Sequence, residues 1–278
     1  MRLKTFILIL VISICLCEAQ SIKLMTYNIR YDNQRDKENR WDLRKEFLTD
    51  QVKFFEPDIM GIQEGLNHQV KYIDKVLSDY EFTGIGRDDG KTKGEYSAIF
   101  YKYRDFLILE SSTFWLSESP EKISVGWDAS MERICSYALF EDINSKQKFY
   151  VFNTHFDHIG DLARKNSAKL IINKIKELNT KYYPVILMGD LNLKPESEAI
   201  QYITKHLNDS KNSAVNISFG PDVTFNGFNY NYSDSKRIDY IFTSKTGIKV
   251  LKYSVLTDSR DLKFPSDHFP VYIEISFI

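Results

Sequence analysis

Short apolar segments of strand length alternate along the chain with segments whose apolar residues recur at helical spacing. The segments predicted as strands are 22–27, 58–63, 97–103, 133–140, 148–154, 184–189, 237–243 and 269–277. Helices are predicted over 41–55, 68–77 and 168–178. Because several strands follow one another in the middle of the chain without a helix between them, the pattern favours two sheets packed face to face, with helices outside.

The first 19 residues have the order of a secretory signal peptide. Two basic residues precede an apolar run over residues 6–17, and the segment ends at a small residue, Ala19. The run is short for a permanent membrane-spanning helix, although an anchor that is not cleaved is the alternative. We therefore expect residues 1–19 to be removed and residues 20–278 to be secreted or periplasmic, without stable membrane insertion.

The rest of the chain is expected to form one domain, most simply a monomer. About 260 residues can enclose a sizeable core, and no stretch rich in Pro, Gly or Ser divides them. Cys135 is the only cysteine beyond residue 19, which rules out an intrachain disulfide framework. The 35 basic and 37 acidic side chains of this segment nearly balance, whereas proteins that bind long nucleic acids usually carry a basic excess. Charge therefore does not favour nucleic acid as a partner.

Six groups of polar residues come directly after predicted strands. The groups are Asn28, Glu64, His155 with Asp157 and His158, Asp190 with Asn192, Asp239, and Asp267 with His268. A single acidic residue or histidine at the start of a loop is usually solvated or caps a helix. The number of these groups, and the apolar strands that present them, indicate a site at one end of the sheets.

These side chains offer the parts that hydrolysis of a phosphate ester requires. A hard cation such as Mg²⁺ binds oxygen ligands, which Glu64 can supply. A carboxylate such as Asp190 can orient the attacking water. Charge on the phosphoryl oxygens needs hydrogen-bond donors. The candidate donors are His155, His268, Asn28 and Asn192.

Two carboxylates are candidates to orient His268. Either Asp239 or Asp267 can hold the imidazole in one tautomer and raise its pKa, as in hydrolase dyads. The alternative for residues 266–270 is a simple turn into the last strand, with an aspartate as cap and a proline at the strand entry.

Six short motifs occur in a fixed order between residues 22 and 276. They are Met25-Thr-Tyr-Asn28, Gly61-Ile-Gln-Glu64, Asn153-Thr-His155, Met188-Gly-Asp-Leu-Asn192, Arg237-Ile-Asp-Tyr-Ile241 and Ser266-Asp-His-Phe-Pro270. In this order the motifs resemble those of the endonuclease/exonuclease/phosphatase superfamily, to which DNase I belongs. The resemblance implies an α/β fold, the DNase I-like four-layer αββα sandwich, with the active site at one edge of the two sheets.

The resemblance also implies two groups of site residues. Those beside the metal, Mg²⁺ or Mn²⁺, are Glu64 as the principal ligand, Asn28 and Asp267. Those implied to act in catalysis are His155, Asp190, Asn192, Asp239 and His268. Among them, Asp190 would activate the water and Asp239 would orient His268, which stabilises the phosphoryl transition state or acts as acid and base. His155 and Asn192 would contact the scissile phosphate.

A second set of motifs is similar to an exported bacterial subgroup of this superfamily with poorly defined substrates. The candidate specificity residues in these motifs are Arg30, Arg87, Glu95, Trp127, Arg133 and Asp157. For each of them, a surface ion pair or a packing contact is the alternative role. Asp157 with His158 either adds a second metal site or a pocket for a polar head group, or Asp157 is the N-cap of the following helix.

The function that we expect is that of a divalent-metal-dependent phosphoesterase, a phosphodiesterase or a phosphatase, of undefined substrate. A secreted nuclease is the second hypothesis. A sphingomyelinase-like phospholipase is the third, for which the aromatic stretch 219–232 is a candidate membrane contact, although its many Asn and Gly residues favour a rim loop. An inactive binding module is the fourth, and it is disfavoured because no motif lacks its carboxylate or histidine.

Overall fold

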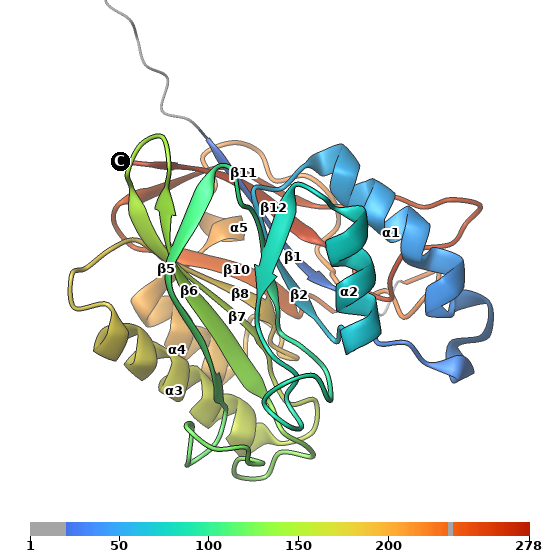
Figure 1. The fold of residues 1–278 in the computed structure, drawn as a ribbon, viewed down its shortest axis with the longest axis horizontal. Coiled ribbons are helices and arrows are strands. Elements are labelled where there is room, and N and C mark those ends of the chain that lie inside the picture. The colour runs from blue at the N-terminus through green and yellow to red at the C-terminus, as the bar shows by residue number, and fades with distance from the viewer. Residues whose placement is uncertain (1–20, 233–235) are drawn as a thin grey trace, which may run out of the picture.

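A computed structural model describes residues 21–232 and 236–278 of the chain, which are built around two six-stranded sheets (Figure 1). The signal peptide predicted over residues 1–19 lies outside these residues. Within the described ranges, no helix is long and apolar enough to span a membrane.

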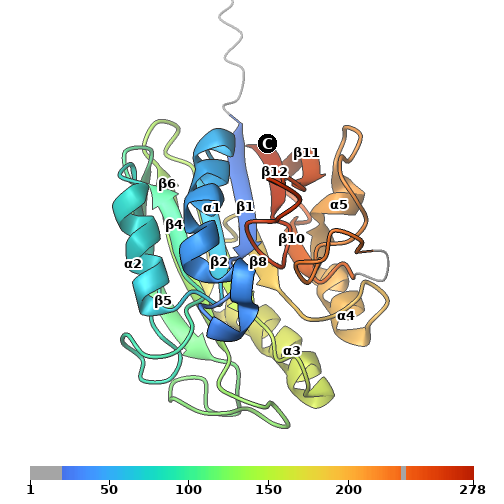
Figure 2. The same ribbon diagram turned by 90° about the vertical axis from the view of Figure 1, so that its right-hand side faces the viewer.

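Each sheet is mostly antiparallel and contains one parallel pair of strands. The first sheet has the order β11 (Ile248–Val255), β12 (Val271–Phe277), β1 (Ile22–Asn28), β2 (Ile59–Gln63), β4 (Ile99–Lys102) and β3 (Tyr80–Thr83). The second has the order β5 (Phe106–Trp115), β6 (Ile134–Asp142), β7 (Lys148–His155), β8 (Val185–Asp190), β10 (Asp239–Ser244) and β9 (Leu207–Asp209). The N-terminal strand β1 and the C-terminal strand β12 pair with each other (Figure 2).

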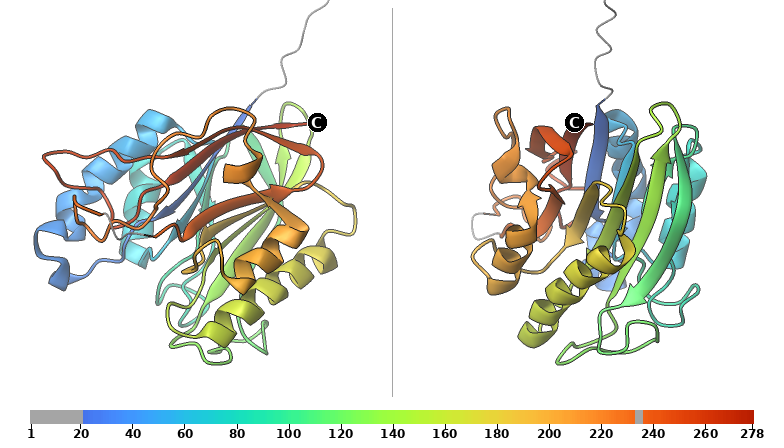
Figure 3. Two further views of the ribbon diagram at one scale, coloured as in Figure 1. Left: turned by 180° about the vertical axis from the view of Figure 1, so that it is seen from behind. Right: turned by 90° about the vertical axis from the view of Figure 1, so that its left-hand side faces the viewer.

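Helices cover the outer face of each sheet. The helices are α1 (Trp41–Phe55), α2 (Asn67–Val76), α3 (Asp161–Leu178), α4 (Glu198–His206), the short α5 (Ser210–Ser213) and a 3-10 helix, η1 (Gln34–Asn39). Helices α1 and α2 pack on the first sheet, while α3 and α4 pack on the second, which gives the layer order helix, sheet, sheet, helix (Figure 3). The predicted αββα sandwich is confirmed.

Three hydrophobic clusters hold these four layers together. One lies between the sheets, and the other two lie between a sheet and its helices. In β8, Ile186 and Met188 face the other sheet while Leu187 faces the helices, because successive side chains of a strand point to opposite faces. Strands buried on both faces need apolar residues at every position, which explains the continuous apolar runs of the sequence. Burying one such Leu, Ile or Met side chain contributes about 1.5–3 kcal/mol to the free energy of unfolding.

The sheets approach each other closely beneath the site. A side chain at Gly61 of β2 would meet Asn153 and the sulfur of Met188 at 2.7 Å, so only glycine fits there. Next to it, Gln63 Nε2 donates to Asn153 Oδ1 at 2.6 Å, and Asn153 Nδ2 donates to the carbonyl oxygens of Ile62 and Ala98 at 2.8 and 2.9 Å. This buried amide pair joins the two sheets just below the ends of the strands.

Candidate active site

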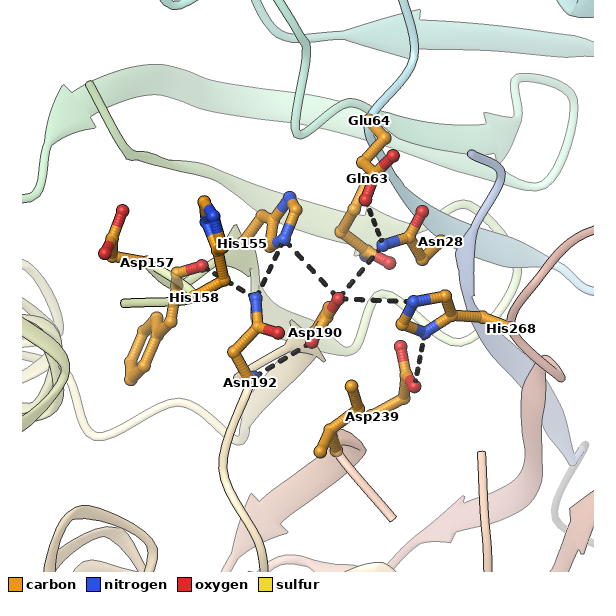
Figure 4. A network of polar contacts seen from close by, with 12 residues as sticks. Asn28, Gln63, Glu64, His155, Asp157, His158, Asp190, Asn192, Asp239 and His268 are labelled. Atoms are coloured by element: carbon orange, nitrogen blue, oxygen red, sulfur yellow. Dashed lines mark hydrogen bonds and ion pairs between the residues drawn. The ribbon is translucent and has the colours of Figure 1, made fainter. Parts of the chain in front are cut away.

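The polar residues that follow the strands meet at one end of the sandwich. In the first sheet, β1 and β2 run parallel, with Asn28 opposite Gln63 and Glu64 immediately after it. In the second sheet, His155 of β7 lies opposite Asp190 of β8, and Asp239 of β10 lies opposite Asp190 on its other side. The register of three neighbouring strands therefore places His155, Asp190 and Asp239 in one row (Figure 4).

Asn28 connects the two sheets at this end. Its Nδ2 donates to Glu64 Oε1 and to Asp190 Oδ2, both at 3.0 Å (Figure 4). Its Oδ1 accepts the backbone amide of Arg30 at 3.0 Å, which fixes the orientation of the side-chain amide. The carboxylates of Glu64 and Asp190 are thus held at a set separation by a fully buried asparagine.

His268 reaches this row from the loop that precedes β12. Its Nδ1 lies 2.9 Å from Asp239 Oδ2, and its Nε2 lies 3.8 Å from Asp190 Oδ2. Burial would lower the pKa of His268, but the charges of Asp239 and Asp190 outweigh it and raise this pKa to about 10. The imidazole is therefore protonated at neutral pH. Of the two carboxylates considered for orienting His268, Asp239 is the one that binds it.

Asp190 is a buried carboxylate at the centre of the row. Burial, and then the negative charge of Asp239, raise the pKa of Asp190 to about 7. Its Oδ1 accepts the backbone amide of Asn192 at 2.9 Å. A carboxylate with a pKa near neutrality is suited to accept a proton from water.

His155 is neutral, in contrast to His268. Burial, and then the positive charges of Arg133 and Arg87, lower the pKa of His155 well below its usual range. Asn192 Nδ2 lies 3.1 Å from Nε2 of His155. When Asn192 donates this hydrogen bond, Nδ1 of His155 carries the proton and points toward Glu95 Oε2, 3.7 Å away. Burial and the charge of Glu64 raise the pKa of Glu95 to about 6.

Three residues at the strand ends have left-handed backbone conformations. The φ angles of Arg30, Glu64 and Asn192 are 56°, 64° and 50°. A non-glycine residue in this region costs on the order of 1 kcal/mol, and such residues are enriched at functional sites. Each of the three lies one or two residues beyond the end of a strand, so the turn redirects its side chain toward the shared end of the sheets.

Arg44 fixes the two loops on the acidic side of the site. It is buried in α1, and its Nη1 donates to the carbonyl oxygens of Ile29 at 2.6 Å and Pro265 at 3.0 Å. Its Nη2 donates to the carbonyl oxygen of Arg30 at 2.7 Å. One guanidinium thereby joins the loop after β1 to the loop that carries Asp267 and His268.

The acidic side of the site has the ligand chemistry of a divalent cation. Arg30 lies between the two carboxylates, with Nη1 3.8 Å from Glu64 Oε2 and Nε 3.7 Å from Asp267 Oδ2. Burial raises the pKa of Asp267, and the negative charge of Glu64 raises it further, so the carboxylates repel each other. Ligand atoms of Glu64, His155 and Asp190 also lie within 4.8 Å of one another. Oxygen donors of this kind fit Mg²⁺ or Mn²⁺.

A cavity of about 550 Å³ opens between the strand ends. It is lined by Arg30, Tyr31, Glu64, Arg87, Glu95, Met131, Arg133, His155, His158, Asp190, Asn192, Phe225, Lys236, Ile238, Asp267 and His268. Sequence reasoning missed Met131, Phe225 and Lys236, which come from loops. The ring of Phe225 contacts that of His268 with its centroid 5.1 Å away, and the aromatic stretch 219–232 that contains it signalled a rim loop.

Two candidate specificity residues lie away from the cavity surface. Trp127 is half-buried and is not among the lining residues, and its backbone amide donates to Glu118 Oε2 at 3.1 Å. Its position gives no support to the predicted contact with substrate. Asp157 is buried behind Arg133, with Oδ2 3.4 Å from Arg133 Nε.

Of the alternative roles considered for Asp157, that of N-cap of the following helix is wrong. The N-cap of α3 is Gly160, and the amides of Leu162 and Ala163 in its first turn donate to Asp128, from the loop between β5 and β6. Asp157 Oδ1 instead accepts the amides of Ile159 and Gly160, just before the helix. Burial would raise the pKa of Asp157, but these amides, Ser130 and Arg133 hold it well below its usual range.

The chain is similar in sequence and in structure to known proteins. Residues 25–268 match the model of the Endonuclease/Exonuclease/phosphatase family. A crystal structure of an endonuclease/exonuclease/phosphatase family protein from Bacteroides thetaiotaomicron superposes with a TM-score of 0.90 at 39% identity, covering 94% of this chain and 99% of that one. A mannosyl-6-phosphatase of the same organism superposes with a TM-score of 0.88 at 39% identity, covering 92% and 100%. An uncharacterized protein of Acanthamoeba polyphaga mimivirus is 24% identical, over 84% of this chain and 91% of its own length.

Proposed function

The chain belongs to the endonuclease/exonuclease/phosphatase family, whose members hydrolyse phosphate esters, and on this premise we propose that its substrate is a small polar phosphate ester, with a sugar phosphate as the first candidate. The main observation in support of the proposal is the cavity that the residues at the strand ends line. Its volume of about 550 Å³ lies within the usual range for small-molecule sites. The similar mannosyl-6-phosphatase supports a sugar phosphate in particular.

Each group of residues in the site has a separate role in the proposed hydrolysis. Glu64 and Asp267, with Asn28 beside them, would hold a divalent cation, which supplies positive charge to the phosphoryl oxygens and the leaving group when bound. Asp190 accepts a proton from the attacking water, because burial and Asp239 raise the pKa of Asp190 to about 7. Water activated in this way can approach the phosphorus atom opposite the leaving group.

The histidines have different roles because their charges differ. Protonated His268 donates from Nε2 to a phosphoryl oxygen, while Asp239 holds its Nδ1. Neutral His155 and Asn192 complete the phosphate site from the other side of Asp190. These groups are positioned before the substrate binds, so they stabilise charge in the transition state with little reorganisation.

The test is a hydrolysis screen in Mg²⁺ or Mn²⁺ that measures inorganic phosphate from monoesters, phosphocholine from sphingomyelin, and nucleotides or shortened strands from nucleic acids. The substrates are hexose phosphates, nucleotides, sphingomyelin, and single-stranded and double-stranded nucleic acids. We expect the highest kcat/KM on a sugar phosphate, and a loss of at least about 100-fold in Asp190→Asn and His268→Ala. A higher kcat/KM on nucleic acid or sphingomyelin would contradict the small-substrate proposal. Wild-type activity in both variants would contradict the site itself.

We propose in addition that the protein acts outside the cytoplasm, secreted or periplasmic, as a monomer. Support comes from the order of basic, apolar and small residues over 1–19. Cell fractionation with intact-mass measurement tests it, and the expected product begins near residue 20. A product of full-length mass in the membrane fraction would contradict it and favour a retained anchor.

A further inference from the structure

Three arginines line the cavity, and two of them form bidentate pairs with carboxylates. Arg30 donates through Nε and Nη2 to Asp36 at 2.9 and 3.0 Å. Arg87 donates through Nη1 and Nη2 to Glu95 at 2.7 and 2.9 Å. A bidentate pair of this kind uses most of the hydrogen-bonding fork and compensates the charge of the guanidinium. Neither arginine has its full charge free for a substrate.

Arg133 is the third arginine, and it is held in a different way. Its Nη2 contacts Nδ1 of His158 at 3.0 Å, so that imidazole accepts a hydrogen bond and adds no negative charge. Its Nε lies 3.4 Å from Asp157 Oδ2, an oxygen that also accepts the amide and hydroxyl of Ser130 at 3.1 and 2.7 Å. Nη1 is buried and has no hydrogen-bond partner among residues 21–232 and 236–278.

The burial of Arg133 makes this arrangement costly without a ligand. The side chain is 4% exposed, although it lines the cavity. A buried donor that finds no acceptor loses the hydrogen bonds it made to water and gains none, and the loss is greater when the donor is charged. An anionic oxygen that contacts Arg133 where it lines the cavity would offset this loss, which favours a substrate that supplies such an oxygen.

The cavity has one side where carboxylates gather around Arg30 and another side that Arg133 and Arg87 line. Glu64 and Asp267 face it from the first sheet, where a cation fits. Arg133 faces it from the second sheet, and Arg87 faces it from the loop between β3 and β4 of the first; burial and these two charges lower the pKa of His155 well below its usual range. A phosphoryl group between these sides presents oxygens to both, so a substrate with more phosphoryl oxygens and more charge satisfies more of the site.

We propose that Arg133 binds the third non-bridging oxygen of a phosphomonoester and thereby makes this enzyme a phosphatase rather than a phosphodiesterase. This inference rests on the function proposed above. A phosphomonoester has three non-bridging oxygens and a charge of about −1.5 to −2 at neutral pH, whereas a diester has two such oxygens and a single charge. At the third position a diester carries an alkylated oxygen, which is a poor acceptor and leaves the buried guanidinium unpaired.

The first test compares two substrates with the same leaving group, p-nitrophenyl phosphate and methyl p-nitrophenyl phosphate, in Mg²⁺ or Mn²⁺. The wild-type protein is expected to prefer the monoester in kcat/KM. Arg133→Met should lower kcat/KM for the monoester by about 100-fold and for the diester by less than about threefold. Arg133→Lys should fall between, because it keeps the charge and loses the fork. Arg104→Met, at an exposed arginine, is the matched control and should match wild type on both esters.

The second test measures binding without turnover. Inorganic phosphate and dimethyl phosphate are titrated into the protein by calorimetry. Arg133→Met should weaken phosphate binding at least about tenfold and leave dimethyl phosphate unchanged. Arg133→Lys provides the same comparison if the methionine variant does not fold. This measurement depends on Arg133 and not on catalysis.

The outcomes separate this inference from the proposed function. Equal losses for the two esters, or for the two anions, would assign Arg133 a structural role and overturn the inference. A wild-type preference for the diester would overturn it while the proposed hydrolysis of phosphate esters stands. Hydrolysis of neither ester, nor of any substrate in the screen, would contradict the proposed function. The calorimetric comparison of inorganic phosphate and dimethyl phosphate would then still decide whether Arg133 binds the third non-bridging oxygen.

Discussion

Asp190 and Asp239 lie directly opposite each other on the antiparallel strands β8 and β10, and His268 contacts both. Burial raises the pKa of Asp190, and the negative charge of Asp239 raises it further. The charges of Asp239 and Asp190 hold the proton on His268. The pairing register of two strands therefore sets the protonation of the proposed base and of the proposed phosphate-binding histidine together.

Asp239→Asn should shift the whole pH profile of activity to lower pH. The charge of Asp239 raises the pKa of Asp190 and of His268, so its removal lowers both. The proposed base then ionises at lower pH, and the proposed donor loses its proton at lower pH. In the wild type this donor is lost only as the pH rises through about 10. The profile of kcat/KM against pH tests this, and limbs at the wild-type positions would contradict it.

The same substitution should also change the pH dependence of stability. Because the folded-state pKa of His268 is raised to about 10, its contribution to stability is fully present below the unfolded pKa of about 6.5 and is lost as the pH rises through 10. Asp239→Asn should therefore destabilise the fold more at pH 6 than at pH 10. Urea unfolding at the two pH values measures the difference, and an equal loss at both would argue against it.

Glu64→Gln should weaken divalent-metal binding by about 10- to 100-fold, because a charged oxygen ligand becomes a neutral one. The fold should be retained, although glutamine has one acceptor oxygen and keeps only one of the two hydrogen bonds that Glu64 accepts, from Asn28 Nδ2 at Oε1 and from the amide of Tyr31 at Oε2. Calorimetric titration of Mn²⁺ checks the affinity. Glu177→Gln, at an exposed helical position paired with Lys174, is the control. Unchanged Mn²⁺ affinity in Glu64→Gln would assign the metal to other ligands.

The interior of the fold could be predicted from the sequence because its strands are buried on both faces. The predicted helix over 41–55 has the observed bounds of α1. Four strands that were not predicted individually, β3, β5, β9 and β11, are the edge strands of the two sheets. In β11, exposed Lys249 and Lys252 interrupt the apolar residues. An edge strand with one solvated face tolerates such charges, and it therefore lacks the continuous apolar run that marks a central strand.

Site residues at the ends of strands could be predicted from the sequence, whereas the positions of site residues in loops could not. Parallel pairing necessarily brings His155 and Asp190 together, because both close adjacent parallel strands. Trp127 and Lys236 lie in loops, where no periodicity fixes the direction of a side chain. The interpretation of Asp157 as a helix cap was wrong because Asp128, which lies 34 and 35 residues before the two amides it binds, takes that role. Such a contact depends on tertiary structure alone.

Gly61→Ala should destabilise the protein by about 1–3 kcal/mol, because the added methyl group would meet Asn153 and Met188 at 2.7 Å between the sheets. Gly65→Ala is the matched control. There the methyl group would meet only the side-chain ends of Ile62 and Val70, both at 3.1 Å, which can move. Thermal unfolding should show a lower Tm for Gly61→Ala than for Gly65→Ala, and the reverse order would contradict the close approach of the sheets.

Arg44→Met should lower both stability and kcat, although Arg44 does not line the cavity. The substitution leaves the buried carbonyl oxygens of Ile29, Arg30 and Pro265 without their donor, at a cost of about 1–3 kcal/mol for each that finds no water. The loop after β1 and the loop before β12 then lose the side chain that joins them. Arg30 and Asp267, which lie in these loops, should therefore move relative to Glu64. We expect a fall in Tm of several degrees together with weaker Mn²⁺ binding, because both carboxylates proposed to hold the metal depend on this geometry. Arg260→Met, which removes an exposed arginine stacked on Phe47, should change neither. A lower Tm with wild-type Mn²⁺ affinity and kcat would limit Arg44 to a role in stability.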